Sequence, residues 1–211
     1  MKKIQSLIIL LILFNHLTAQ VFVRQAGENE EIFVKRIYNI TEFVHPIIVT
    51  KELDSTKQVI ICFVKFSKEN TNGGFIGFIL TPSLNNFYRQ TIIDTFWQGG
   101  GVRAKEITTI FFANCDNEIN REIIVMSSAI SKSPRFAPND VVGNFYESFV
   151  YDNFDLNNPP NKLIELKNIS EIFQEFDGKI YSSKTGKLLN VKKAKYKSEI
   201  SIRQKLKELG F

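Results

Sequence analysis

The stretch Phe111–Met126, FFANCDNEINREIIVM, places two short apolar runs on either side of a polar segment. The first run ends at Ala113 and the second begins at Ile123, which is the pattern of two strands joined by a turn. Within the polar segment, oxygen-bearing side chains stand at every second position. The stretch therefore predicts an antiparallel strand pair whose connection is either a plain turn or a cation-binding loop.

Similar apolar runs continue through most of the chain before residue 155. Alternation with a period of two is typical of strands with one buried face, and turn residues such as Asn72-Gly73-Gly74 and Asn85-Asn86 separate them. About eight short strands are predicted, at residues 32–40, 45–53, 57–66, 75–81, 87–97, 102–113, 122–130 and 144–154. Short strands at near-regular spacing indicate an antiparallel β-meander.

The pattern changes at Asp155–Asn161, a polar segment with two prolines that is typical of a boundary. Apolar residues then recur at three- and four-residue spacing from Leu166 to Phe176, which predicts a short helix that ends at Asp177-Gly178. Ser198 is suited to cap a last helix, and Gly210 is suited to stop it. Two short C-terminal α-helices that pack on the sheet are therefore expected.

The predicted fold class is α+β, with an antiparallel β domain at residues 20–154 and a basic helical extension at residues 155–211. The net charge is −1 over residues 20–150 and +4 over residues 151–211. The basic run Lys192–Lys197, KKAKYK, is suited to contact an anionic surface or another envelope protein. The alternative is a solvated connector, and no nucleic-acid partner is expected for an exported chain.

The first nineteen residues have the features of an export signal. Lys2 and Lys3 precede the apolar run Leu7–Phe14, and Ala19 is a small residue at a cleavage position. The apolar run is far shorter than the roughly 20 residues that a membrane span needs, and no cysteine follows it to carry a lipid anchor. We therefore predict a signal peptide at residues 1–19 and a periplasmic or secreted protein without a membrane span after cleavage.

Histidine and cysteine limit the chemistry that the chain can perform. His45 is the only histidine after the predicted signal, which excludes a zinc site built on a pair of histidines. Cys62 and Cys115 are the only cysteines, and export permits a disulfide between them. The sequence does not say whether their Cα atoms lie within bonding range, so a disulfide and two free thiols both stay open.

The polar segment has the register of a calcium loop. Its five predicted ligands, at positions one, three, five, seven and nine, are Asn114, Asp116, Glu118, Asn120 and Glu122. Calcium prefers six to eight oxygen ligands. The register resembles the aspartate-rich loop of FG-GAP or VCBS blade repeats, D-x-[DN]-x-D-G-x-x-[DE], which lies between two strands. The resemblance implies a calcium site here, although Ile119 stands where those repeats have glycine.

The motif occurs once in the chain, so a propeller with several blades is not predicted. A turn that binds no metal is the alternative interpretation of the same residues. Calcium is thus the one cofactor for which the sequence offers candidate ligands.

No motif assigns a substrate, and we interpret the chain as an exported, non-catalytic binding or interaction protein of unknown ligand. One alternative is a hydrolase that uses carboxylates such as Asp94, Asp116 and Glu122. Another is a structural component of the cell envelope. An enzyme would bring two carboxylates together in a pocket, one of them with a strongly shifted pKa. A binding module would instead expose an apolar or aromatic patch.

Overall fold

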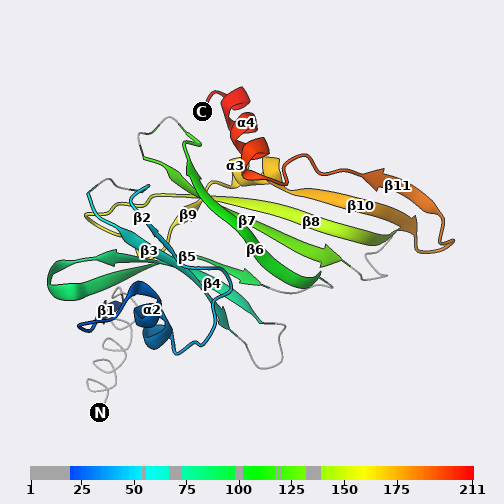
Figure 1. Cartoon of the computed structure of the whole chain (residues 1–211). Coiled ribbons are helices and arrows are strands. Elements are labelled where there is room, and N and C mark those ends of the chain that lie inside the picture. The colour runs from blue at the N-terminus through cyan, green and yellow to red at the C-terminus, as the bar shows by residue number, and fades with distance from the viewer. Residues whose placement is uncertain are drawn as a thin grey trace, which may run out of the picture.

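The computed structural model describes residues 20–53, 56–66, 73–97, 102–116, 118, 120–131 and 139–211. The predicted signal peptide at residues 1–19 lies outside these residues. Within the described part, eleven strands form two antiparallel sheets that are accompanied by short helices (Figure 1). The α+β class is confirmed, with two sheets where the sequence predicted one meander of about eight strands.

The first sheet has five strands in the order β1-β5-β4-β3-β2. Their bounds are Val21–Val23 for β1, Ile48–Thr50 for β2, Val59–Phe66 for β3, Gly74–Pro82 for β4 and Phe87–Trp97 for β5. The short connection between β4 and β5 contains a 3-10 turn, η1, at Leu84–Asn86. Asn85 and Asn86 both have a positive φ there, 57° and 62°, a conformation that asparagine tolerates better than most residues.

The second sheet has the order β11-β10-β8-β7-β6, and the short strand β9 pairs with the end of β8. Their bounds are Val102–Ala113 for β6, Glu122–Ser131 for β7, Asn139–Asp152 for β8, Ile164–Glu165 for β9, Glu175–Ser182 for β10 and Leu188–Lys192 for β11. Strand β8 therefore pairs with β7 on one edge, and with β10 and β9 on the other.

An apolar layer between the two sheets, called here the inner layer, forms the main core. Its buried members in the sheets are Val59, Ile61, Phe63, Phe75, Ile79, Ile93 and Phe96 from the first sheet and Ile107, Phe112, Ile123, Val125 and Tyr151 from the second. Successive side chains on a strand point to opposite faces. Ile123 and Val125 therefore enter the inner layer, whereas Ile124 and Met126 face the other side of the second sheet.

Helices cover the outer face of each sheet, so the described part has four layers (Figure 1). Helix α2, Glu30–Tyr38, buries Phe33 and Val34 against the first sheet. On the second sheet, α3 at Lys167–Ser170, the 3-10 turn η2 at Glu171–Phe173 and α4 at Glu199–Leu209 cover a second apolar cluster. None of the helices in the described ranges is long and apolar enough to cross a membrane.

The strand predicted at residues 32–40 is wrong, because α2 occupies most of this segment. The Asn29 side chain caps the helix by accepting a hydrogen bond of 2.8 Å from the backbone N–H of Ile32. Two acidic residues in the first turn and two basic residues in the last turn match the helix dipole. Asn39 then ends the helix in a left-handed conformation with a φ of 50°. These end signals outweigh the loose apolar alternation.

The helix predicted at residues 166–176 is shorter in the structure, because Phe176 lies in β10. Gly178, which was expected to end that helix, instead lies opposite Gly143 of β8. A Cβ at Gly178 would lie 2.4 Å from the carbonyl oxygen of Val142, so glycine permits β8 and β10 to pair at this point.

None of the eight predicted strands covers residues 179–197, but these residues contain the rest of β10 and the whole of β11. This hairpin extends away from the packed layers (Figure 1), and every residue of β11 is exposed. A strand without a buried face carries no strict apolar alternation, which explains the error. The last helix is confirmed: Ser198 forms a capping box with Ser201, and Gly210 ends α4 with a φ of 96°.

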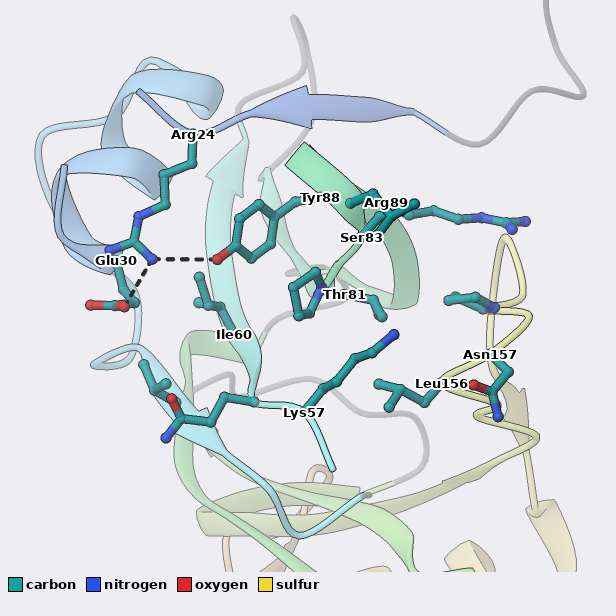
Figure 2. A pocket seen from close by; sticks show the side chains of 15 residues that line it. Arg24, Glu30, Lys57, Ile60, Thr81, Ser83, Tyr88, Arg89, Leu156 and Asn157 are labelled. Carbon is teal, nitrogen blue, oxygen red and sulfur yellow. Dashed lines mark hydrogen bonds and ion pairs between the residues drawn. The ribbon is translucent and has the colours of Figure 1, made fainter. Parts of the chain in front are cut away.

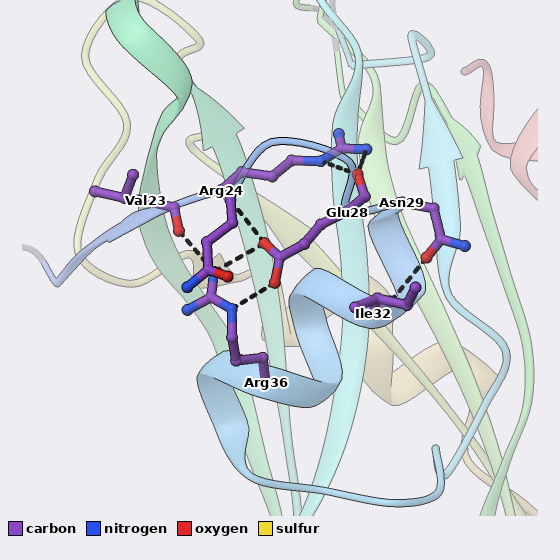
Figure 3. Close-up of polar contacts among 7 residues, drawn as sticks. Val23, Arg24, Glu28, Asn29, Ile32 and Arg36 are labelled. Carbon is purple, nitrogen blue, oxygen red and sulfur yellow. Dashed lines mark hydrogen bonds and ion pairs between the residues drawn. The ribbon is translucent and has the colours of Figure 1, made fainter.

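A network of charges around Glu28 connects α2 to β1 (Figure 3). The Glu28 carboxylate accepts hydrogen bonds from the Arg36 guanidinium and from the backbone N–H of Gln25 at 2.7 Å. Arg24 donates to the backbone carbonyl of Glu28 at 2.6 Å, and Arg36 donates to that of Val23 at 2.7 Å. The hydrogen bonds from Arg36 are the main reason why the pKa of Glu28 falls to about 2.

Cys62 and Cys115 are both free and buried, so the open question of a disulfide is answered for this structure. Cys62 packs in the cluster beneath α2, and Cys115 packs in the cluster beneath α3 and α4. Both sheets and the inner layer therefore lie between the two thiols. Burial raises the pKa of both thiols well above the ordinary value, which keeps them in the unreactive protonated form.

We expect the substitution Glu28→Gln to lower the melting temperature at pH 6 but not at pH 2. Because the folded pKa of Glu28 is depressed, its contribution to stability is present above the unfolded value of about 4.5 and is lost as the pH falls through about 2. Thermal melts of both proteins between pH 2 and pH 6 measure this difference. Glu31→Gln, which removes an exposed i,i+4 pair with Lys35, is the matched control and should change little at any pH. A constant difference between wild type and Glu28→Gln across the range would contradict the assignment.

We also expect both thiols to resist alkylation by iodoacetamide in the folded protein and to react fully in 6 M guanidinium, because burial excludes the reagent. Intact mass measured before and after unfolding counts the modified cysteines. The unfolded protein should take up two labels without prior reduction. A mass that accepts no label until a reductant is added would show a disulfide and overturn this account.

Candidate metal centre

Three carboxylates meet where β6 turns into β7. The ligand oxygens of Asp116, Glu122 and Asp152 all lie within 4.8 Å of one another. We call these three residues the acidic triad. Asp116 belongs to the turn, Glu122 begins β7 and Asp152 ends β8. Because Ile123 pairs with Tyr151, the next position outward places Glu122 opposite Asp152, and the side chains of such cross-strand neighbours lie on one face.

Glu122 is the buried member of the acidic triad, with 1 % of its surface exposed. Its Oε2 accepts a hydrogen bond from the backbone N–H of Cys115, which holds the carboxylate against the turn. Its Oε1 is also buried and has no hydrogen-bond partner among the residues that the structure describes. A buried polar atom without a partner costs about 1–3 kcal/mol, so this oxygen is available to a ligand that carries positive charge.

In the part of the chain that the structure describes, no ion pair balances the charge of the acidic triad. Arg121 forms an ion pair with Glu52, and Arg203 forms one with Glu199 at 2.7 Å. Within the described ranges, no lysine or arginine forms an ion pair with any of the three carboxylates. Like charges on facing strand positions repel each other, so a fully ionised triad without a counter-ion is unfavourable.

The pKa of Glu122 reports this environment. It is raised to about 7, mainly by burial and also by repulsion from Asp116 and Asp152, although the hydrogen bond from the Cys115 N–H lowers it. Without a bound cation, Glu122 is therefore partly protonated near neutral pH. A cation would replace that proton as the source of positive charge.

Of the five predicted ligands, the structure brings Asp116 and Glu122 together. Asp116 Oδ1 accepts a hydrogen bond of 2.7 Å from the backbone N–H of Glu118, which tightens the turn. Glu118 itself lies outside the acidic triad and is exposed, as are Asn114 and Asn120. Ile119, at the position where the blade repeats have glycine, lies outside the described residues.

Sequence reasoning missed Asp152. It is remote from the polar segment in the chain, and it reaches the turn only because β8 pairs with β7 in a particular register. The sequence shows only that Asp152 is a carboxylate near the end of the strand predicted at residues 144–154. Knowledge of the register between the two strands would have been needed to place it beside Glu122.

The donor set of the acidic triad fits a hard divalent cation. Carboxylate oxygens are the protein ligands that calcium and magnesium prefer. Glu122 supplies the unpartnered oxygen, and Asp116 and Asp152 are half-buried and able to complete one side of a coordination shell. Backbone carbonyls and water would supply the remaining oxygens, as they do in most calcium sites.

Other residues singled out in the sequence have structural partners elsewhere. Asp94 forms an ion pair with Lys162 at 2.6 Å and accepts a hydrogen bond of 3.1 Å from the Tyr151 hydroxyl. Asp94 therefore does not join Asp116 and Glu122, which the carboxylate hydrolase would need. The His45 Nδ1 lies 2.7 Å from the carbonyl oxygen of Pro46 in a local turn.

The basic run Lys192–Lys197 is anchored on β10. Asp177 forms an ion pair with Lys197 at 2.7 Å and a longer one with Lys193 at 3.7 Å. The Glu175 carboxylate also accepts a hydrogen bond of 2.8 Å from the backbone N–H of Tyr196. Two of the four lysines in this run are thus paired inside the protein, and contact with an anionic surface or an envelope partner remains a prediction.

We expect the metal-free protein to lose stability as the pH rises from 4.5 to 8. The folded pKa of Glu122 is raised, so the folded state holds a proton that the unfolded chain has released between pH 4.5 and about 7. Glu122→Gln keeps the shape without the charge and should remove this loss. With EDTA present, the variant should exceed wild type at pH 8 by up to about 3 kcal/mol, measured by urea unfolding. A variant that is less stable than wild type at pH 8 would contradict the assigned environment.

Comparison with known proteins identifies no relative of this chain. No family model, no curated protein and no solved structure matches the chain. The case for a function therefore rests on the acidic triad and on the other described features of the molecule.

Proposed function

We propose that the chain is an exported, non-catalytic binding protein that holds a divalent cation of the calcium type at the acidic triad. The observation that carries this proposal is the buried, unpartnered Oε1 of Glu122 beside two further carboxylates. Export is proposed on the signal-like residues 1–19.

Cation binding accounts for the arrangement better than hydrolysis does. Glu122 is 1 % exposed, so an organic substrate has no access to its carboxylate, whereas a small ion needs only one free oxygen. A carboxylate-dependent hydrolase would also need a second carboxylate across a pocket, and Asp94 is held by Lys162 instead. The raised pKa of Glu122 is accounted for by burial and by its two acidic neighbours without any catalytic role.

A bound cation would have a structural effect that follows from the topology. Asp116 lies in the β6–β7 turn and Asp152 ends β8, so one ion would tie the turn to the third strand of the same sheet. The ion would also neutralise the repulsion that otherwise acts between these carboxylates. Binding of this kind stabilises the folded state, because the unfolded chain does not assemble the site.

Calcium fits this site better than magnesium. Magnesium demands near-ideal octahedral geometry and retains several waters, whereas calcium accepts irregular sets of oxygen ligands. Few protein ligands on a partly exposed turn favour a weak site, and extracellular calcium modules bind in the range of about 10⁻⁴ to 10⁻³ M. Such an affinity suits a protein that works outside the cytoplasm.

We expect 5 mM calcium to raise the melting temperature of the wild-type protein relative to EDTA, because calcium binds the folded state alone. Glu122→Gln and Asp152→Asn should each abolish most of this increase. Glu118→Gln is the matched control: it removes a carboxylate from the same turn but outside the acidic triad, and it should retain the increase. Differential scanning calorimetry at pH 7.5 measures all four proteins.

Two results would overturn the proposal. Superimposable melts of the wild-type protein in calcium and in EDTA would show that no cation binds the folded state. A response that survives Asp152→Asn but is lost in Glu118→Gln would place calcium on the ligands expected from the loop register and not on the acidic triad.

A further inference from the structure

A groove of about 500 Å³ lies at the edge of the first sheet, where β3 begins, β4 ends and β5 begins. We call it the rim groove (Figure 2). Glu30 of helix α2 and Arg24, the residue that follows β1, lie on one side, and Leu156 and Asn157 lie on the opposite side. A groove of this size is within the range of sites for small molecules.

Positive charge in the rim groove exceeds negative charge. Arg24 is neutralised by an ion pair of 3.0 Å with Glu30, and it also donates a hydrogen bond of 3.3 Å to the Tyr88 hydroxyl. Lys57 and Arg89 line the same groove, and neither forms an ion pair with a carboxylate of the described chain. Two uncompensated cations remain, and Figure 2 shows the Lys57 side chain extending toward Thr81.

Two polar groups of the rim groove are buried without a partner. The Thr81 hydroxyl belongs to a side chain that is 3 % exposed, and neither this hydroxyl nor Arg89 Nε has a hydrogen-bond partner among the described residues. Thr81 and Arg89 pair across β4 and β5, so their side chains leave the sheet on the same face. Unpartnered buried polar groups are uncommon in folded proteins, and here two of them belong to residues that line one groove, with Arg89 directed away from Thr81 (Figure 2).

The remaining wall of the rim groove is largely apolar. Its apolar members are Val49, Ile60, Pro82, Leu84, Leu156 and Pro159. Leu84 is 83 % exposed, which is unusual for a leucine beside a groove that other apolar residues line. A ligand with an apolar body would cover it. Polar groups that fix orientation, together with an apolar wall, are the usual composition of a small-molecule site.

We infer that the rim groove binds a small organic anion, with its carboxylate or phosphate group at Lys57 and Thr81 and a short apolar body against Leu84 and Leu156. The anion supplies an acceptor for the Thr81 hydroxyl and compensates the charge of Lys57, and Arg89 adds to the positive potential of the groove. This inference goes beyond the proposed cation binding and shares no residue with the acidic triad.

Isothermal titration calorimetry with three probes of equal chain length tests the inference: octanoate, octyl phosphate and the neutral 1-octanol. All titrations contain EDTA, so the acidic triad plays no part in the result. We expect at least one anion to bind at least tenfold more tightly than 1-octanol, with an affinity that falls as salt is added. The tighter of the two anions identifies the ligand as a carboxylate or as a phosphate. Equal or absent binding of all three probes would overturn the inference.

Substitutions connect the binding to these residues. Lys57→Gln should weaken the preferred anion at least tenfold, whereas Lys51→Gln, an exposed lysine outside the groove, should change the affinity less than twofold. Equal effects of the two substitutions would contradict the site.

Thr81→Val gives a second readout that a purely structural threonine would not produce. Removing a buried hydroxyl that has no partner should leave the melting temperature of the ligand-free protein unchanged or higher. The same substitution should weaken the preferred anion at least fivefold. A lower melting temperature together with unchanged affinity would show that the hydroxyl serves the fold and not a ligand.

Discussion

The structure depends on the burial of one apolar layer between two antiparallel sheets. Because side chains alternate along a strand, each sheet that contributes to the inner layer also has a second face. Helix α2 covers this face of the first sheet, and α3 and α4 cover it on the second sheet. Tyr151 illustrates how the sheets are held together. Its ring is buried in the inner layer, and its hydroxyl donates to Asp94 of the first sheet, so apolar contact and a hydrogen bond fix the same pair of strands. Further from this layer, the β10–β11 hairpin has no covering face and is exposed.

The two candidate sites lie where strands leave the inner layer. Glu122 is the first residue of β7, one position before the fully buried Ile123, and Thr81 lies near the end of β4, next to the fully buried Leu80. Neighbouring packing excludes water from both positions, yet no protein group completes their hydrogen bonds within the described ranges. In the interior, ladder hydrogen bonds satisfy the backbone and apolar side chains need no partner. At these two strand ends a buried polar atom lacks such a partner, and this is the reason why we propose that a ligand supplies one.

Much of the fold could be predicted because burial imposes alternation. The strands around Ile61, Ile79 and Ile123 have one face in the inner layer, and their residue patterns marked them correctly. Helix α2 was missed because its loose apolar alternation was given more weight than the cap at Asn29 and the charges at its ends. The polar turn after β6 was predicted, and with it Asp116 and Glu122, since local sequence alone determines a turn. Asp152 and the rim groove could not be predicted, because each depends on which strands pair and in which register.

One segment of chain connects the two candidate sites, and its contacts fix part of the wall of each. After Asp152 the chain passes Leu156 and Asn157, which line the rim groove, and then runs beside β5. It is held there by the Thr91 hydroxyl, which donates to the carbonyl of Pro160 at 2.6 Å, and by backbone hydrogen bonds of 2.9 Å between Ile92 and residues 161 and 163. The end of β8 and the wall of the groove are therefore fixed by the same contacts that join the two sheets. A ligand binds more weakly when its binding must order a flexible segment of the protein. The fold already fixes the walls of these sites, so a few polar contacts are sufficient for recognition. Under that condition one free carboxylate oxygen, or one free hydroxyl beside a lysine, would be enough to bind the ligands proposed for these sites.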